Sequence, residues 1–425
     1  MAQHLLKIGE FPGLPLGEKM VEKERLNLLV VSSYYRPAIV YGGPVEVIHR
    51  GSLAVAALGH QVTTYTTDAN GTGDLKVPRG RPILVDRLPV WYFPRWWFGR
   101  ARKPFSIFFS PEMGRQLRRL KAGDYDLLLI HAGFGDPGRM AAAAARRTGI
   151  PYICYTHGGF EPWALYDKYW KKRLYLALVE GRILQEAAGI IVCNDAETQE
   201  LRRLGIRSPV CPIPWGVDLP DPHRLPGKER LEELWPHLAG RSFALFLSRL
   251  HPKKGLDLLI PAFASLAQEF PDWLLVLAGP DEKGYQAKLV RLVEELNLSQ
   301  RVSFPGMVTG EGKAALLAQA QFLVLPSYSE GFPVAVAEAL GYGRPVVITT
   351  SCYVPEVAEG EAGLVVSPEV GALARALGEM MRDSAFRGKC SQKAIEVAKR
   401  HFTWEAVAKQ TLNFYREVMS CRSYD

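Results

Sequence analysis

The chain has 425 residues, of which 48% are hydrophobic and 23% charged, and its formal net charge is +8. One core usually supports no more than roughly 250–300 residues, so the length predicts two domains. No apolar run approaches the roughly 20 residues that span a bilayer, and the beginning of the chain lacks the apolar segment of a signal peptide. We therefore expect a cytoplasmic protein, whose positive charge predicts anionic partners.

Short apolar segments alternate with helical segments through the first half of the chain. The predicted strands are 26–32, 61–66, 127–131, 152–156 and 189–193, and the predicted helices are 44–58, 111–121, 138–148 and 171–187. Alternation of this kind predicts parallel βαβ units. A segment rich in proline and glycine, 209–227, then interrupts the pattern and predicts a hinge near 212–228.

The alternation restarts after this segment. The predicted strands are 243–248, 273–278, 302–304, 322–326, 345–349 and 363–366, and the predicted helices are 256–269, 285–296, 312–320, 333–341 and a last one at 403–418. The chain is therefore expected to be an α/β protein with two facing, doubly wound, Rossmann-like domains. The expected division is an N-terminal extension (1–24), an N-terminal domain (25–214) and a C-terminal domain (215–402). Ligands of such sheets bind at the carboxyl ends of the strands, so the site is expected between the domains.

The segment PSYSEGFPVAVAEAL follows a predicted buried strand and leads into a helix. Pro333 suits the first helical position, and the free N–H groups of a helix start, together with the helix dipole, form an anion site. Glu330 and Glu338 lie eight residues apart beside this site, where carboxylates suit sugar or ribose hydroxyls. By spacing alone, a polar cap on a solvated helix explains the pair equally well.

Three other loops that follow predicted strands carry groups suited to a phosphorylated ligand. Arg249 and Lys254 lie in the motif SRLHPKKG, where a guanidinium fork and an ammonium suit a diphosphate. Gly42 and Gly43 open a helix and let the backbone approach a phosphate. His157 could bond a sugar hydroxyl. Each loop also has a simpler interpretation: an exposed basic loop, a plain βα turn and a structural histidine.

Taken in order, these motifs resemble those of the retaining nucleotide-sugar glycosyltransferases of family 4, which have the two-domain GT-B fold. The resemblance covers most of residues 26–416. It is carried by Gly42-Gly43, His157, Ser-Arg-x5-Gly at 248–255, Gly306-Met307-Val308 and the E-x7-E motif from Glu330 to Glu338.

The resemblance implies sugar transfer from a UDP- or GDP-linked donor to an acceptor. It also implies that residues 403–425, which include the last helix, cross back to the N-terminal domain. No D-x-D element accompanies the donor motifs, so neither metal nor cofactor is expected. The implied catalytic residues are Glu330, Lys254, Arg249 and His157. The implied donor-binding residues are Gly42, Gly43, Arg249, Lys254, Gly279, Met307, Val308, Glu330, Gly331, Phe332, Pro333 and Glu338. Trp215 departs from the Asn that is common at this place in the family, and Gly158 from an acidic residue.

Two segments mix aromatic and basic residues, a combination that suits an anionic membrane surface. They are WYFPRWWFGRARKPF at 91–105 and a second segment at 168–175. A loop that packs against the core, with a solvated rim, is the alternative. The residues expected on the acceptor or membrane side are Trp91, Arg95, Trp96, Trp97, Trp170, Lys171 and Lys172. The prediction is a peripheral enzyme at the inner face of the membrane that extends a lipid-linked glycan in cell-surface polysaccharide or glycolipid synthesis. Nucleic acid is not expected, because no binding-module motif accompanies the charge.

Two other functions compete with this prediction. GFGDPG at 133–138 matches the dinucleotide fingerprint G-x-G-x-x-G, which favours an NAD(P)-dependent oxidoreductase. Against it, Pro137 removes an N–H, and the expected acidic residue is not placed at a strand end. A nucleotide-sugar epimerase or hydrolase of similar fold is the closer alternative.

Overall fold

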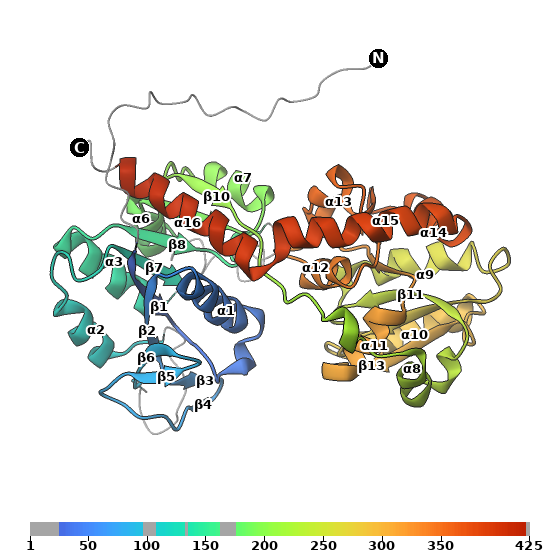
Figure 1. Cartoon of the computed structure of the whole chain (residues 1–425), viewed down its shortest axis with the longest axis horizontal. Helices are drawn as coiled ribbons and strands as arrows, with labels where there is room; N and C mark the ends of the chain where they lie inside the picture. The colour runs from blue at the N-terminus through green and yellow to red at the C-terminus, as the bar shows by residue number, and fades with distance from the viewer. Residues whose placement is uncertain (1–24, 97–107, 132–134, 162–175, 422–425) are drawn as a thin grey trace, which may run out of the picture.

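The structure of the protein is a computed structural model that describes residues 25–96, 108–131, 135–161 and 176–421. The chain forms two α/β halves that lie side by side, each built on its own sheet with helices packed against it (Figure 1). The predicted α/β class and the two Rossmann-like sheets are confirmed. Among the described residues, no helix has both the length and the apolar character that crossing a bilayer demands.

An eight-stranded sheet organises the first half, in the order β10-β9-β8-β7-β1-β2-β6-β5. All neighbours pair in parallel except β5 and β6, which are antiparallel at one edge. The strands are β1 (Asn27–Ser32), β2 (Gln61–Thr67), β5 (Ile83–Val85), β6 (Leu88–Phe93), β7 (Leu127–His131), β8 (Tyr152–Tyr155), β9 (Gly189–Val192) and β10 (Val210–Pro212), with the small pair β3 (Ala69–Asn70) and β4 (Gly73–Asp74) outside the sheet. The described α-helices are α1 (Gly43–Ala57), α2 (Pro111–Arg118), α3 (Asp136–Thr148), α6 (Gly181–Glu186) and α7 (Asp195–Arg203).

A six-stranded parallel sheet organises the second half, in the order β13-β12-β11-β14-β15-β16. Its strands are β11 (Ser242–Leu247), β12 (Trp273–Ala278), β13 (Val302–Gly306), β14 (Phe322–Leu325), β15 (Val346–Thr349) and β16 (Gly363–Val366). Its helices are α8 (Lys228–Leu234), α9 (Leu256–Ala264), α10 (Tyr285–Glu295), α11 (Gly310–Gln319), α12 (Val334–Gly341), α13 (Glu356–Glu359), α14 (Val370–Arg382) and α15 (Ser384–Val397). The central strands are continuous apolar runs buried at every position, as expected of parallel strands that helices cover on both faces.

Side-chain caps and a glycine set several helix ends. Ser110 Oγ accepts from the N–H of Met113 at the start of α2, and Asn194 Oδ1 accepts from the N–H of Glu197 at the start of α7. Gly149 ends α3 with a left-handed φ of +75°. Asn194 closely follows the end of β9, so its cap fixes where the loop at the carboxyl end of that strand passes into α7.

The last helix, α16 (Trp404–Cys421), leaves the second half and packs on the first (Figure 1). Leu412, Phe414, Tyr415 and Val418 are buried in the same apolar cluster as strand β1. The hydroxyl of Tyr415 also contacts the hydroxyl of Tyr155, the last residue of β8 in the same sheet. The core of the first half is therefore completed by the last segment of the chain.

The segment predicted to face a membrane begins inside the first sheet, which corrects part of that prediction. Trp91 lies in β6, stacks on Phe93 with 6.3 Å between ring centroids and packs against the core. The Arg95 side chain is 6% exposed and lies 2.8 Å from Asp74 Oδ1. Both side chains serve the fold, because Trp91 packs on the buried residues of β6 and Arg95 pairs with Asp74. The remaining residues of the prediction are the exposed Trp96 and four outside the described residues, Trp97, Trp170, Lys171 and Lys172.

Candidate active site

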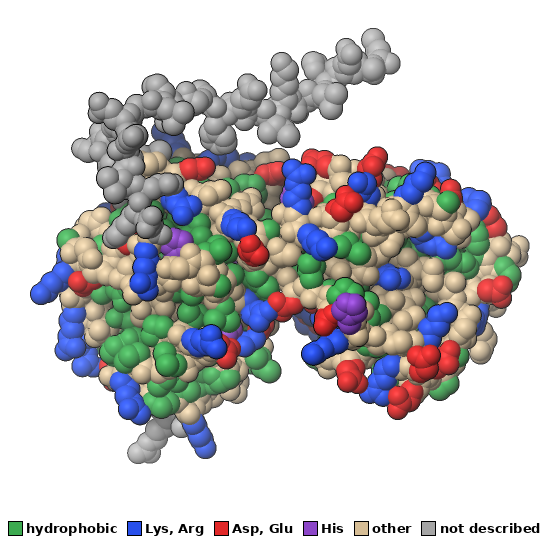
Figure 2. All heavy atoms as spheres, viewed as in Figure 1, with side chains coloured by type: hydrophobic (Ala, Val, Ile, Leu, Met, Phe, Trp, Pro, Cys, Tyr) green, Lys and Arg blue, Asp and Glu red, His purple; other side chains and the backbone are tan. Residues whose placement is uncertain are grey.

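A cleft of about 350 Å³ opens in the second half, at the carboxyl ends of its strands. Figure 2 shows the molecule hollowed between the two halves. The cleft brings together residues from three separate sequence motifs, as expected for strand ends that meet at one sheet edge. The predicted residues in its lining are Arg249, Lys254, Gly279, Met307, Val308, Glu330, Phe332, Pro333 and Glu338.

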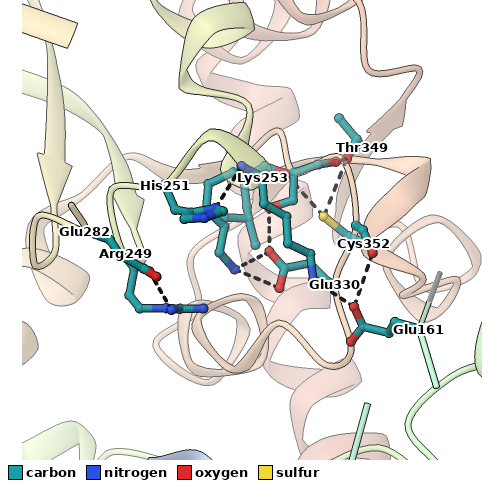
Figure 3. A network of polar contacts seen from close by, with 12 residues as sticks. Glu161, Arg249, His251, Lys253, Glu282, Glu330, Thr349 and Cys352 are labelled. Atoms are coloured by element: carbon teal, nitrogen blue, oxygen red, sulfur yellow. Dashed lines mark hydrogen bonds and ion pairs between the residues drawn. The ribbon is translucent and has the colours of Figure 1, made fainter. Parts of the chain in front are cut away.

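A buried ion pair lies on the wall of this cleft. Lys254 Nζ is 2.6 Å from Oε1 and 2.9 Å from Oε2 of Glu330, and the two side chains are 10% and 7% exposed (Figure 3). Ser327 Oγ donates to the same carboxylate, and Thr349 Oγ1 donates to the Ser327 carbonyl at 2.5 Å. Buried charges are tolerated only when they are paired and hydrogen-bonded, and this network meets both conditions.

Gly255 allows Lys254 to reach Glu330. Its φ is +68°, and a Cβ at this position would lie 2.0 Å from the carbonyl oxygen of Pro326. The Tyr328 N–H donates to the Lys253 carbonyl at 2.8 Å, just beyond the same contact. Backbone contact therefore holds the turn that carries Lys254 against the loop that carries Glu330, which brings two of the predicted motifs together.

Two further cations lie nearer to solvent at the cleft. Arg249 Nη1 is 2.6 Å from Glu282 Oε2, and its side chain is 60% exposed. Lys313 Nζ is 2.7 Å from Glu338 Oε1. Lys313 was not predicted, although a lysine in the first turns of the helix after β13 was available as a signal. Each of these cations is thus held by a carboxylate of the same half.

The start of helix α12 completes the cleft. Phe332 and Pro333 precede it directly, and Val334 is its first residue. The first N–H groups of a helix lack partners within the helix, and the dipole adds positive potential there. With Lys254 and Arg249, this end of the cleft favours an anion, whereas Glu338 offers a carboxylate further along the helix.

His157 lies outside the lining of this cleft. Its Nε2 is 2.9 Å from Nδ1 of His131, and its ring lies against Trp215 with 6.1 Å between centroids. Both histidines line a separate, mainly apolar cavity between the first sheet, α1 and α16. The surrounding protein lowers the pKa of His157 to about 4 by desolvation, and burial also lowers the pKa of His131. The proposed contact of His157 with a donor sugar stays a prediction.

Gly42, Gly43 and Gly331 also lie outside the lining. Gly43 opens α1 against the indole of Trp215, since a Cβ on it would lie 2.9 Å from that ring. Gly331 faces the first half through Asn194, whose Nδ2 donates to its carbonyl at 2.6 Å. Trp215, where the sequence departs from the family pattern, therefore fills space between the helix start and His157.

Stability should depend on pH through His157, whose pKa the surrounding protein lowers. An unfolded histidine binds a proton near its ordinary pKa of 6.5, whereas folded His157 does so only near 4. The unfolded state then binds more protons in this window, so stability is lost as the pH falls from about 6.5 towards 4. We expect the melting temperature to fall from pH 7 to pH 5. It should fall less in His157→Asn, because this variant lacks the titrating group. Asn is chosen because it tolerates the local φ of +51°. An equal fall in both proteins would contradict this role, and the exposed His223→Asn serves as the control.

The described residues contain no group of three or more His, Cys, Asp and Glu side chains that could hold a metal ion.

Sequence reasoning also missed Glu161 and Asn194, which reach across to the second half. Glu161 directly follows the motif that contains His157, and Asn194 stands three residues before Glu197 at a helix start, a pattern typical of a cap. Both signals were present, but neither indicates a contact with a distant loop.

Comparison with known proteins assigns the class. Two protein-family models match the chain: "Glycosyl transferase 4-like domain" over residues 42–216 and "Glycosyl transferases group 1" over residues 228–397. The D-inositol 3-phosphate glycosyltransferase of Mycobacterium tuberculosis is 29% identical over 399 residues, which cover 89% of this chain and 79% of that protein. The protein of the same name from Nocardioides sp. is 28% identical over 330 residues, covering 72% and 70%.

Solved structures show the same fold. HepE of Anabaena in complex with UDP matches with a TM-score of 0.68 at 19% identity, covering 92% of this chain and all of the other. Sucrose-phosphate synthase of Thermosynechococcus elongatus matches with a TM-score of 0.65 at 22% identity, covering 94% of this chain and all of the other. The fold and the matches define an enzyme that transfers glycosyl groups. The chain belongs to the group 1 glycosyltransferases of family 4, with the GT-B fold.

The predicted transferase activity is thereby confirmed, and the two competing functions are not. The GFGDPG segment lies within the matched "Glycosyl transferase 4-like domain". Its described part leads into α3, which starts at Asp136 with Pro137 in its first turn. A proline there is favourable for the helix but removes an N–H that a dinucleotide phosphate would need.

Proposed function

We propose that this enzyme transfers a sugar from a UDP-sugar to an acceptor hydroxyl with retention of configuration at the anomeric carbon. The observation that carries the proposal is the shared cleft of Arg249, Lys254, Glu330 and Glu338. The cations and the start of α12 would hold the diphosphate, Glu330 the sugar and Glu338 the ribose. No metal is required in this scheme, because the two cations supply the positive charge.

The donor nucleotide is proposed from the relatives. HepE of Anabaena is described in complexes with UDP and with UDP-glucose, and it shares the fold of this chain. The base would lie near Met307 and Val308, which line the cleft at the end of β13. Backbone groups there suit the polar edge of a base.

In the proposed reaction the bond between the anomeric carbon and the phosphate oxygen breaks first. Lys254 and Arg249 would stabilise the negative charge that develops on the departing diphosphate. The acceptor oxygen then bonds to the anomeric carbon on the same face, and its proton passes to the departing phosphate oxygen. This sequence needs no dedicated base, which fits the pairing of Glu330 with Lys254.

Two kinds of acceptor have support. The curated relatives are named for D-inositol 3-phosphate, a small phosphorylated polyol. The aromatic and basic surface of this chain instead favours a lipid-linked glycan, and we propose this second kind. The first is kept as the alternative because it rests on the names of relatives.

The experiment for the donor is binding of UDP, GDP and ADP by calorimetry, followed by turnover of UDP-glucose. We expect UDP to bind most tightly, and the product formed with a membrane lipid fraction to keep the α configuration of UDP-glucose by NMR. D-inositol 3-phosphate serves as the parallel acceptor. Tighter binding of GDP or ADP, or a product of inverted configuration, would contradict the proposal.

Contact with an anionic membrane surface is part of the proposal. Trp96 is 54% exposed and lies against Phe109, with 6.1 Å between ring centroids, just before α2. Arg115 and Arg118 on α2 and Arg119 at its end are exposed and have no acidic partner in the described part of the chain. Figure 2 shows Lys and Arg side chains along this edge of the first half. An aromatic group beside unpaired cations suits an interface with anionic lipid.

Vesicle flotation tests this surface. We expect the protein to float with phosphatidylglycerol vesicles at low salt, and a variant with Arg115, Arg118 and Arg119 changed to Ser to remain at the bottom. A second variant with Arg291, Arg375 and Lys399 changed to Ser, which loses the same charge on the other half, should float. Equal behaviour of the two variants would refute the assignment of this surface.

A further inference from the structure

The carboxylate of Glu161 crosses from the first half to the second. It lies shortly after β8, and its side chain is 7% exposed. Its Oε2 is 2.7 Å from Lys253 Nζ and accepts from Ser329 Oγ at 3.2 Å (Figure 3). Both partners belong to the two loops that form the buried pair in the cleft. Glu161 therefore contacts the two loops that carry Lys254 and Glu330, although it does not line the cleft.

The backbones of the two halves also touch at this point. A Cβ on Gly331 would lie 2.2 Å from Glu161 Oε1 and 3.4 Å from the Cα of Gly158. Asn194 Nδ2 donates across the same boundary to the carbonyls of Glu330 at 3.1 Å and Gly331 at 2.6 Å. The loop of the first half therefore lies directly against the loop that carries Glu330.

Two consecutive lysines connect this contact to the cleft. Lys253 and Lys254 share the turn Pro252–Lys254. Lys254 pairs with Glu330 inside the second half, and Lys253 pairs with Glu161 across the boundary. Lys254 directly follows Lys253 in one helical turn. A displacement of the Lys253 backbone therefore also displaces Lys254, which is the partner of Glu330. The position of the first half is thus coupled to the geometry of the buried pair.

We propose that Glu161 is a positioning residue for the transfer reaction. Through Lys253 and Ser329 it holds the two loops in the arrangement in which Lys254 and Glu330 meet the donor. Glu161 can contact Lys253 only when the two halves are together. The arrangement of Lys254 and Glu330 therefore depends on the position of the first half, which would receive the acceptor. This inference rests on the proposed function, and it adds a residue that the cleft does not contain.

Glu161→Gln tests the proposal, because it removes the charge and keeps the shape. We expect kcat for transfer from UDP-glucose to fall by about 10- to 100-fold, the usual cost of a misplaced catalytic group. The Kd for UDP should change much less than kcat, since Arg249 and the start of α12, which also line the cleft, still hold the diphosphate. A residue with a merely structural role would lower the melting temperature and leave kcat of the folded fraction intact, so both are measured.

Asp218→Asn is the matched control. Asp218 forms an ion pair with Arg50 of α1, which also joins the first half to the segment beyond β10, but it lies outside the cleft. Its kcat should equal that of the wild type. A loss equal to that of Glu161→Gln would show that any contact between the halves has the same effect and would overturn the inference.

A double-mutant cycle tests whether Glu161 acts through Lys253. The variant with Glu161→Gln and Lys253→Met should be no slower than the slower single variant, because both changes break one contact. Multiplied losses would refute the coupling. If Glu161→Gln does not fold, Glu161→Asp replaces it, with the same expected split between kcat and the Kd for UDP.

The two proposals fail separately. A wild-type protein that binds no UDP and transfers no sugar would refute the proposed function. A wild-type protein that transfers sugar while Glu161→Gln keeps the full kcat would refute only the role of Glu161.

Discussion

Lys254→Ala should lower the turnover of sugar transfer by about 10²–10³, the usual cost of losing one group that stabilises the leaving charge. Lys254 contacts both carboxylate oxygens of Glu330 on the wall of the cleft, so its loss removes a cation and also releases Glu330. The measurement is kcat for transfer from UDP-glucose. Turnover near that of the wild type would remove Lys254 from the mechanism.

Loss of stability must be separated from loss of chemistry in this variant. Breaking a buried ion pair costs about 3–5 kcal/mol, because the partner charge is left buried alone. The double variant with Lys254→Ala and Glu330→Gln removes that charge as well. We expect it to regain most of the free energy of unfolding but none of the turnover. Regained turnover would mean that Lys254 served only to neutralise Glu330.

Phe414→Ala should destabilise the first half by about 3–5 kcal/mol, the usual cost of truncating a buried phenylalanine. Phe414 is 6% exposed, and its ring packs so closely on β9 that a Cβ on Gly189 would lie 2.7 Å from it. The free energy of unfolding is measured by urea denaturation, with circular dichroism as the signal. The transition of the first half should move, although the mutated residue follows the second half in sequence.

The control is Lys409→Ala in the same helix, whose side chain is exposed and paired with Glu405. Exposed substitutions of this kind usually change stability by less than about 0.5 kcal/mol. If Phe414→Ala changed stability no more than Lys409→Ala, α16 would not belong to the core of the first half.

Much of the fold was predictable because parallel strands are continuous apolar runs. The predicted strands 127–131, 273–278 and 363–366 have the same bounds as β7, β12 and β16. Strand β6 was missed, because Pro89 and Pro94 flank its aromatic residues and suggest a loop. Pro89 is tolerated because it lies near the start of β6, before Val90–Phe93, the residues that pair with β2.

The cleft was predictable for a similar reason. Its residues follow strands directly, so their meeting is a consequence of the sheet order. Pairings between side chains were not predictable. Lys253 and Glu161 are 92 residues apart, and Arg249 pairs with Glu282 rather than pointing freely into the cleft. Such contacts depend on how loops of different strands pack, which no local pattern encodes.

The position of α16 has a consequence for how the protein is made. Strand β10 ends at Pro212, but the helix that covers its sheet starts only at Trp404. At the usual pace of synthesis, the ribosome needs about 10 to 40 s to produce the chain between them. Throughout this interval the nascent first half presents the apolar surface that α16 later covers, including the side of α1 that it contacts. The core of the first half is therefore complete only after α16 has been synthesised.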